Sequence, residues 1–123
     1  MSLGIALLIT ACIGSASLAR FRNSEFQLLA GAHGTLELED GCFRLRMPGG
    51  ATYNLYWASD AVVNGDGSTV TLNGVTATVG ESVMVGGGEM NVDRETVASF
   101  DWVEAPAERC IHGPDWFVWQ LPT

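Results

Sequence analysis

The stretch TLELEDGCFRLR, residues 35–46, decides the fold, because apolar residues alternate with polar ones on both sides of an Asp-Gly pair. Such alternation is typical of strands with one buried face. A type I′ turn favours Asp40-Gly41, since both of its central residues need a positive φ. The two-residue turn predicts a register that puts the apolar pairs on one face and Cys42 on the other. The predicted pairs are Glu39 with Cys42, Leu38 with Phe43, Glu37 with Arg44, and Leu36 with Leu45.

Further strands follow along the chain. Asn73-Gly74 predicts a second hairpin that pairs Leu72 with Val75 and Val70 with Ala77. Alternation predicts strands at residues 53–57, 81–85 and 116–121, with Gly86-Gly87-Gly88 ending the second of these, and residues 94–103 read as a loop with a short helix. Several short strands separated by Gly-rich turns favour an all-β fold. We expect a six- to seven-stranded antiparallel barrel of OB-like size, built from tight hairpins and carrying one disulfide, rather than a sandwich.

The amino-terminal residues have the features of an export signal. The apolar run Leu3–Ile9 is too short to span a bilayer but has the length of a signal-peptide core. Ile9-Thr10-Ala11-Cys12 matches the bacterial lipobox, in which the cysteine becomes the lipidated first residue. Ser17-Leu18-Ala19 offers a second cleavage site, whereas the usual positive charge before the apolar run is missing. A short buried helix is the alternative. We therefore expect a signal peptide at 1–19, a mature chain that begins at Cys12 or after Ala19, a tether at 20–33 and a barrel domain at 34–123.

The three cysteines fit this division. Once Cys12 is assigned to lipid or lost with the signal, Cys42 and Cys110 remain as a pair in an oxidising compartment. This predicts a Cys42–Cys110 disulfide. Two separate buried thiols, or a metal half-site formed by Cys110 and His112, are the alternatives.

Composition excludes some classes of partner. The 123 residues suffice for one domain. Lys and Arg number 6, all of them arginines, against 14 Asp and Glu, which gives a net charge of -8. Binding to a nucleic-acid backbone needs clustered cations, so we expect no nucleic-acid partner. The same charge disfavours electrostatic docking on anionic lipid, so membrane contact is expected only through a lipid at Cys12.

Candidate chemistry is sparse. No nucleophile motif is present, and residues 64–68 resemble a calcium loop but place Val62 where its first carboxylate belongs. We expect no catalytic residue, metal or cofactor, and His33 and His112 are expected in exposed loops. The large aromatic supply is the most distinctive feature. Alternation places Trp116 and Val118 on one face of the last strand and Phe117 and Trp119 on the other; one face is core, and the other is either covered by residues 94–108 or exposed. The side chains considered for a binding patch are Trp57, Trp102, Trp116, Phe117 and Trp119.

Residues 34–45, with their Gly41-Cys42 pair, resemble part of an uncharacterised family of small exported bacterial β-domains. The resemblance extends to Trp119 through Leu55-Tyr56-Trp57, Val79-Gly80-Glu81-Ser82-Val83, Gly86-Gly87-Gly88-Glu89 and Cys110. Ala58 and Glu81 depart from the family pattern, where proline and aspartate are expected. The resemblance implies an exported β-domain and no particular activity.

Three functions remain open. The first is a non-catalytic envelope domain, exported or anchored by lipid, that binds or supports an unknown envelope protein or ligand. The second is an acidic inhibitor of a basic cell-wall hydrolase, because a charge of -8 steers cationic partners. The third is a small-ligand or metal-binding protein, or an enzyme, that uses Cys110 and His112.

Overall fold

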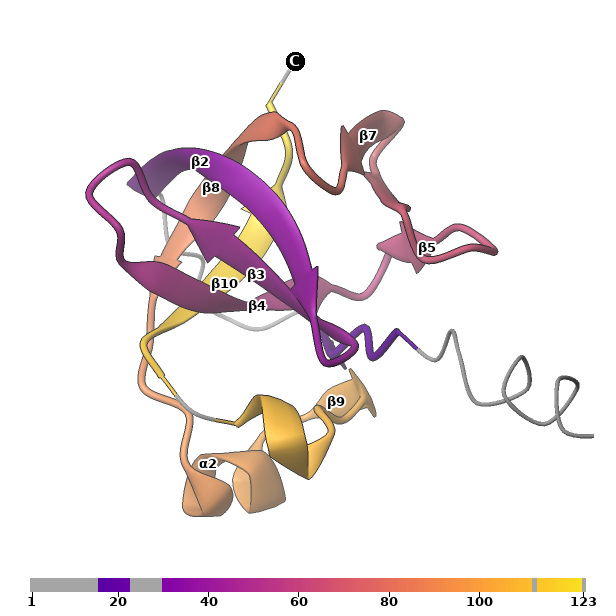
Figure 1. Cartoon of the computed structure of the whole chain (residues 1–123). Coiled ribbons are helices and arrows are strands. Elements are labelled where there is room, and N and C mark those ends of the chain that lie inside the picture. Colours follow the sequence, from indigo (N-terminus) through magenta and orange to yellow (C-terminus); the bar gives the residue numbers. More distant parts are fainter. Residues whose placement is uncertain (1–15, 23–29, 112, 123) are drawn as a thin grey trace, which may run out of the picture.

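The computed structural model describes residues 16–22, 30–111 and 113–122, and a closed β-barrel forms its centre (Figure 1). The barrel order is β2–β3–β4–β10–β8, and β8 returns to β2. These strands are β2 (Ala30–Glu39), β3 (Cys42–Arg46), β4 (Thr52–Ala58), β8 (Ser82–Glu89) and β10 (Asp115–Gln120). All neighbours are antiparallel except β4 and β10, which are parallel. The predicted small β-barrel is confirmed, but five strands close it and one pairing differs from the expected antiparallel order.

Both predicted hairpins have the expected register. β2 and β3 pair Leu38 with Phe43 and Leu36 with Leu45. Asp40 and Gly41 have φ of 53° and 78°, as a type I′ turn requires. The second hairpin joins β6 (Thr69–Leu72) to β7 (Val75–Thr78) through Asn73 and Gly74, whose φ angles are 52° and 82°. Local turn chemistry therefore sets both registers.

A separate three-stranded sheet packs against the barrel. It has the order β5–β6–β7, with β5 at Val62–Val63. Val70, Leu72 and Ala77 of this sheet are buried in the same apolar cluster as the inward-facing residues of the barrel, such as Leu36 and Phe43. The sheet thus extends the main core beyond the barrel strands.

The chain before β2 also belongs to the fold. β1 (Arg20–Phe21) pairs in parallel with the end of β4, and Ser17 bridges to Cys42. Leu18, Ala19 and Phe21 are buried. The expected tether at 20–33 is therefore wrong for its described residues, since Arg20–Phe21 and residues 30–33 lie in strands. The expected lipobox and Cys12 lie outside the described residues.

Residues 90–111 leave the barrel and return to its outer surface; we call them the cover segment. They contain α2 (Arg94–Ser99), β9 (Trp102–Glu104) and the 3-10 helix η1 (Glu108–Cys110). Asp93 caps α2 by accepting a hydrogen bond from the Thr96 amide, and β9 pairs with β1. The short helix expected within 94–103 is confirmed. Figure 1 shows the cover segment on the lower side of the barrel.

The triple glycine does not end a strand, as the sequence suggested, but lies inside β8. A Cβ atom on Gly87 would lie 1.7 Å from the carbonyl oxygen of Phe117 in β10. The backbones of β8 and β10 therefore approach each other where only glycine fits. The pairing also shifts register here, between Val118 and Gln120.

Cys42 and Cys110 form the predicted disulfide, which joins the start of β3 to η1. It links positions 68 residues apart, and on the loop-entropy model such a bridge stabilises the fold by about 4 kcal/mol. The disulfide attaches the cover segment to the barrel.

Candidate functional site

The outward aromatic face of β10 is covered rather than exposed. Phe117 has an exposed fraction of 0% and Trp119 of 8%. They form a second apolar cluster with Phe21 and Tyr56, and Val97, Phe100 and Trp102 of the cover segment pack against it. Ring centroids of Phe21 and Trp119 are 4.7 Å apart. The alternative in which residues 94–108 cover this face is the one observed.

The inward aromatic residues fill the barrel. Trp57 is fully buried beside Phe43, and Trp116 is buried beside Tyr53. Of the five side chains considered for a binding patch, only Trp102 is half-buried, and Trp57, Trp116, Phe117 and Trp119 are buried. The exposed aromatic patch is therefore wrong, because both faces of β10 are packed.

A buried polar cluster lies where the cover segment leaves and rejoins the barrel. The Asp115 carboxylate has one oxygen, Oδ1, that accepts hydrogen bonds from Tyr56 Oη at 3.0 Å and Asn54 Nδ2 at 3.4 Å. The other oxygen, Oδ2, accepts one from the Val92 amide at 3.0 Å. Asp115 and Asn54 are both nearly inaccessible to solvent. One carboxylate on β10 thus joins the start of the cover segment to β4.

This cluster raises the pKa of Tyr56 far above the ordinary value of 10.0. Burial is the main cause, and the charge and hydrogen bond of Asp115 add to it. The positive charge of Arg44 acts in the opposite direction. The phenol therefore stays protonated and donates to Asp115, which is the behaviour of a structural hydrogen bond.

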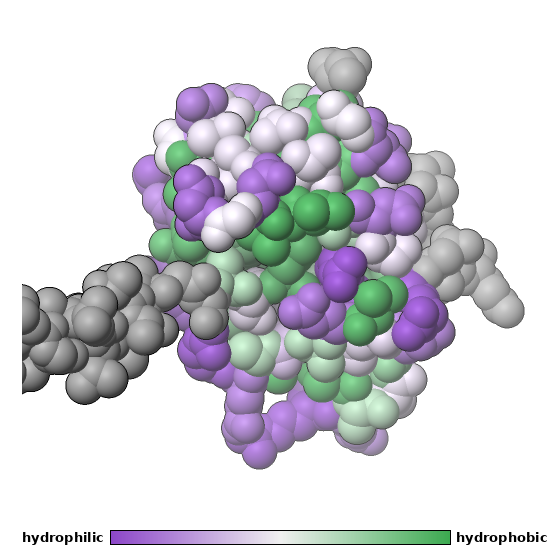
Figure 2. Space-filling model, turned by 90° about the vertical axis from the view of Figure 1, so that its right-hand side faces the viewer, coloured by the Kyte–Doolittle hydropathy of each residue, from purple (hydrophilic) through white to green (hydrophobic). Residues whose placement is uncertain are grey.

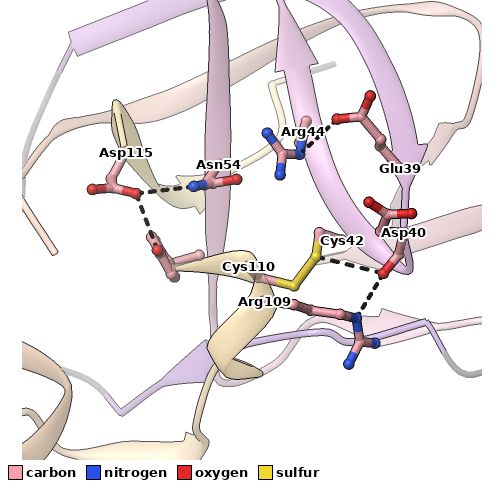
Figure 3. The surroundings of a disulfide bond; sticks show 9 residues. Glu39, Asp40, Cys42, Arg44, Asn54, Arg109, Cys110 and Asp115 are labelled. Carbon is pink, nitrogen blue, oxygen red and sulfur yellow. Dashed lines mark hydrogen bonds and ion pairs between the residues drawn. A yellow bond between two sulfur atoms is a disulfide. The ribbon is translucent and has the colours of Figure 1, made fainter. Parts of the chain in front are cut away.

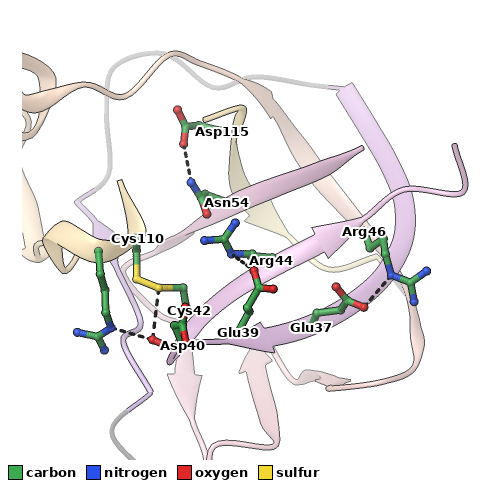
Figure 4. Close-up of polar contacts among 10 residues, drawn as sticks. Glu37, Glu39, Asp40, Cys42, Arg44, Arg46, Asn54, Cys110 and Asp115 are labelled. Carbon is green, nitrogen blue, oxygen red and sulfur yellow. Dashed lines mark hydrogen bonds and ion pairs between the residues drawn. A yellow bond between two sulfur atoms is a disulfide. The ribbon is translucent and has the colours of Figure 1, made fainter. Parts of the chain in front are cut away.

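The disulfide lies beside the tip of the first hairpin (Figure 3). Arg109 Nε donates to the Asp40 carbonyl oxygen at 2.7 Å, next to the bridge. On the outer face of the hairpin, Arg44 contacts Glu39 at 3.4 Å and Arg46 contacts Glu37 at 2.7 Å (Figure 4). Cys42 and Cys110 are themselves buried, so the bridge is shielded from solvent.

Most of the positive charge is matched by carboxylates. Three further ion pairs join Arg20 to Glu104, Arg22 to Asp101 and Arg94 to Glu108. Together with the two pairs on the hairpin, these involve five of the six arginines. Asp60, Glu81 and Glu95 are exposed and form no ion pair with another described residue. The surface therefore keeps a net excess of carboxylates.

The strongest candidate for a binding surface is a groove between the amino-terminal residues, β5 and β9. We call it the N-terminal groove, and it has a volume of about 180 Å³. Ala16, Leu18, Ala61, Val62 and Val63 supply its apolar lining, and Arg20 and Glu104 its polar lining. Figure 2, which faces the side that carries β5 and β7, shows an apolar area between hydrophilic residues. Val62 is 56% exposed, the highest value among large apolar side chains of the described residues.

The described residues form neither a metal site nor a membrane-spanning helix. The disulfide occupies the Cys110 sulfur, which removes it as a metal ligand, and His112 lies outside the described residues. His33 is exposed in β2 rather than in a loop, and Asp66 binds Ser68 within a turn. Among the described residues, no group of three or more His, Cys, Asp or Glu side chains has the arrangement of a metal site. Nor do these residues include a helix that is long and apolar enough to cross a membrane.

No protein-family model, curated protein or solved structure matches this chain. The resemblance to a family of small exported domains stays a prediction.

Two features of the structure were not predicted from the sequence. Asp115 follows Gly113-Pro114 and reads as a loop residue, and the Ser17–Phe21 segment is too short to give a strand signal. The one hint in the sequence that this segment packs on the barrel was the pair of apolar residues, Leu18 and Phe21, on either side of the charged Arg20.

Proposed function

We propose that this chain is a non-catalytic β-domain of the bacterial cell envelope, anchored through lipid at Cys12, that acts by binding a partner at its surface. The observation that carries the proposal is the Cys42–Cys110 disulfide. Such bridges persist in oxidising compartments outside the cytoplasm and are rare inside it. The bridge therefore supports an extracytoplasmic location.

The packing of residues 17–19 favours the lipobox over the second cleavage site. The Ser17 amide donates to the Gly41 carbonyl, and the Trp57 amide donates to the Ala19 carbonyl at 2.8 Å. Leu18 is 3% exposed within the main core. Cleavage after Ala19 would remove all of these contacts, whereas cleavage before Cys12 keeps them.

Surface binding is also consistent with the shape of the molecule. Four depressions lined by described residues have volumes between about 180 and 370 Å³, which lie below or at the lower end of the usual range for ligand pockets. The fixed cover segment leaves the outer aromatic face unavailable. Recognition is therefore assigned to exposed side chains rather than to a deep cavity.

The test is an intact-mass measurement, before and after reduction, on protein recovered from membranes and from medium of expressing bacteria. We expect a chain that begins at Cys12, carries added acyl mass and gains two thiols only on reduction. A Cys12→Ser variant, the matched control, should lose the acyl mass and leave the membrane fraction while keeping the disulfide. An uncleaved chain with three free thiols would contradict the proposal.

A second candidate function, inhibition of a basic cell-wall hydrolase, is favoured by the distribution of charge. Five arginines are held in ion pairs, so carboxylates such as Asp60, Glu81 and Glu95 are left to attract a cationic enzyme. We expect inhibition of a lysozyme-like enzyme that weakens at about 300 mM salt, because added ions screen exposed charges. The triple variant D60N/E81Q/E95Q should inhibit less. Absent or salt-independent inhibition would exclude this function.

A further inference from the structure

We infer that the N-terminal groove and the exposed side chain of Val62 dock on the lipid surface to which Cys12 is anchored. The inference rests on the proposed lipid anchor, but it concerns the orientation of the folded domain. It assigns one face of the barrel to the membrane and leaves the remaining surface for a partner.

The length of chain between the anchor and the fold carries the argument. Ala16 lines the groove, and Cys12 precedes it by four residues. Four residues span at most about 14 Å when fully extended. A lipid at Cys12 therefore holds Ala16, and the groove with it, close to the headgroups.

The groove presents apolar side chains at this short distance. Val62 is 56% exposed, and Val63 lies beside it in β5. Ala61 extends this apolar lining, and β9 forms the opposite border of the groove through Glu104. β5 and β9 lie on the same side of the molecule as the first described residues (Figure 1). Transfer of such side chains from water to a lipid interface is favourable in proportion to their apolar area.

The charges of the groove do not oppose this contact. Arg20 donates to the Ser59 carbonyl and forms an ion pair with Glu104 at 3.2 Å, so the two lining charges neutralise each other. The net charge of -8 does repel an anionic membrane, and Asp60 lies near Val62 in sequence. Docking therefore depends on the tether and on apolar contact, and is strongest on zwitterionic lipid.

The chemistry of the cysteines allows docking to be tested apart from acylation. Cys42 and Cys110 are bonded to each other, so the thiol of Cys12 in the full chain can be coupled to a maleimide lipid in phosphatidylcholine nanodiscs. A nitroxide-labelled lipid in the disc then broadens the backbone amide NMR signals of residues near the membrane. We expect the strongest broadening at residues 61–63 and 103–104, and weak broadening in β8.

Two matched variants place a carboxylate at an exposed apolar position. Val62→Asp should abolish the localised broadening, whereas Met84→Asp, at a position that is 45% exposed in β8, should preserve it. Unchanged hairpin amide signals would show that both variants fold. Uniform broadening in the unmodified chain, or an unaltered pattern in Val62→Asp, would overturn the docking inference. Absence of acyl mass in the cell experiment would instead contradict the anchor.

Discussion

The carboxylate of Asp115 in β10 is buried among donors from two other parts of the chain. It joins Tyr56 and Asn54 of β4 to the Val92 amide at the start of the cover segment. A buried carboxylate is tolerated when its oxygens are hydrogen-bonded, and its removal takes this acceptor away from every donor around it. This one side chain therefore supports both the barrel and its cover.

Replacement of Asp115 should weaken the fold substantially. Asp115→Ala leaves the Tyr56 hydroxyl, the Asn54 amide and the Val92 amide without this acceptor, and we expect a loss of about 3 kcal/mol in the free energy of unfolding. Asp60→Asn, at an exposed carboxylate, should change it by less than about 0.5 kcal/mol. Urea unfolding of both variants checks the prediction. Equal stability of the two would show that the buried cluster contributes little.

The raised pKa of Tyr56 predicts the direction of the alkaline response. Because the folded state holds the proton more tightly, its stabilisation is complete below the ordinary pKa of 10.0. Above that pH the unfolded chain loses the proton first, so stability falls as pH rises. Urea unfolding at about pH 9 and pH 11 should show a smaller pH-dependent loss in Tyr56→Phe than in the unmodified chain. Identical losses would contradict burial of an ionisable phenol.

At the scale of elements, the pairing of β8 with β10 depends on a glycine. A side chain at Gly87 would overlap the Phe117 carbonyl oxygen, which belongs to the backbone and cannot rotate away. We expect Gly87→Ala to cost at least about 3 kcal/mol, since the two strands must separate. Gly49→Ala is the matched control, because nothing lies within 4 Å of its Cβ position. Thermal unfolding of the two variants distinguishes them, and similar melting temperatures would refute the close approach.

The disulfide predicts a difference between elements as well. The double variant C42S/C110S should lose about 4 kcal/mol of stability, and hydrogen exchange should increase more in α2 and β9 than in the β2–β3 hairpin. The Cys12→Ser variant controls for cysteine replacement and should match the unmodified chain in both measurements. Uniform acceleration of exchange would mean that the bridge stabilises the whole fold rather than the cover segment.

The sequence predicted those elements whose cause is local. Asp40-Gly41 and Asn73-Gly74 set the hairpin registers through turn geometry, and the single pairing open to Cys42 and Cys110 set the disulfide. The parallel pairing of β4 with β10 was not predictable, because no short turn links the two strands. The residues of each strand also do not indicate with which other strand it pairs. The N-terminal groove was missed for the same reason, since Ala16, Val62 and Glu104 meet only in the folded chain.

At the scale of the whole molecule, two apolar clusters lie on opposite sides of one strand. β10 places Trp116 and Val118 in the barrel core, and Phe117 and Trp119 in the cluster beneath the cover segment. Alternation along a strand normally separates a buried face from a solvated one, but here both faces are packed. The continuous run of aromatic residues at 116–119 reflects this double burial.

The position of β10 in chain order also determines when the barrel can close. β2, β3, β4 and β8 all precede it, so the barrel has an open seam between β4 and β8 until residues 115–120 are available. Pairings between such distant segments form slowly, because long stretches of chain must first be ordered. For a chain that is threaded through a membrane from its amino terminus, the seam stays open until nearly all of these residues have crossed. On the export route that we propose, this topology would keep the barrel open during translocation, and the barrel would close only after residues 115–120 had crossed.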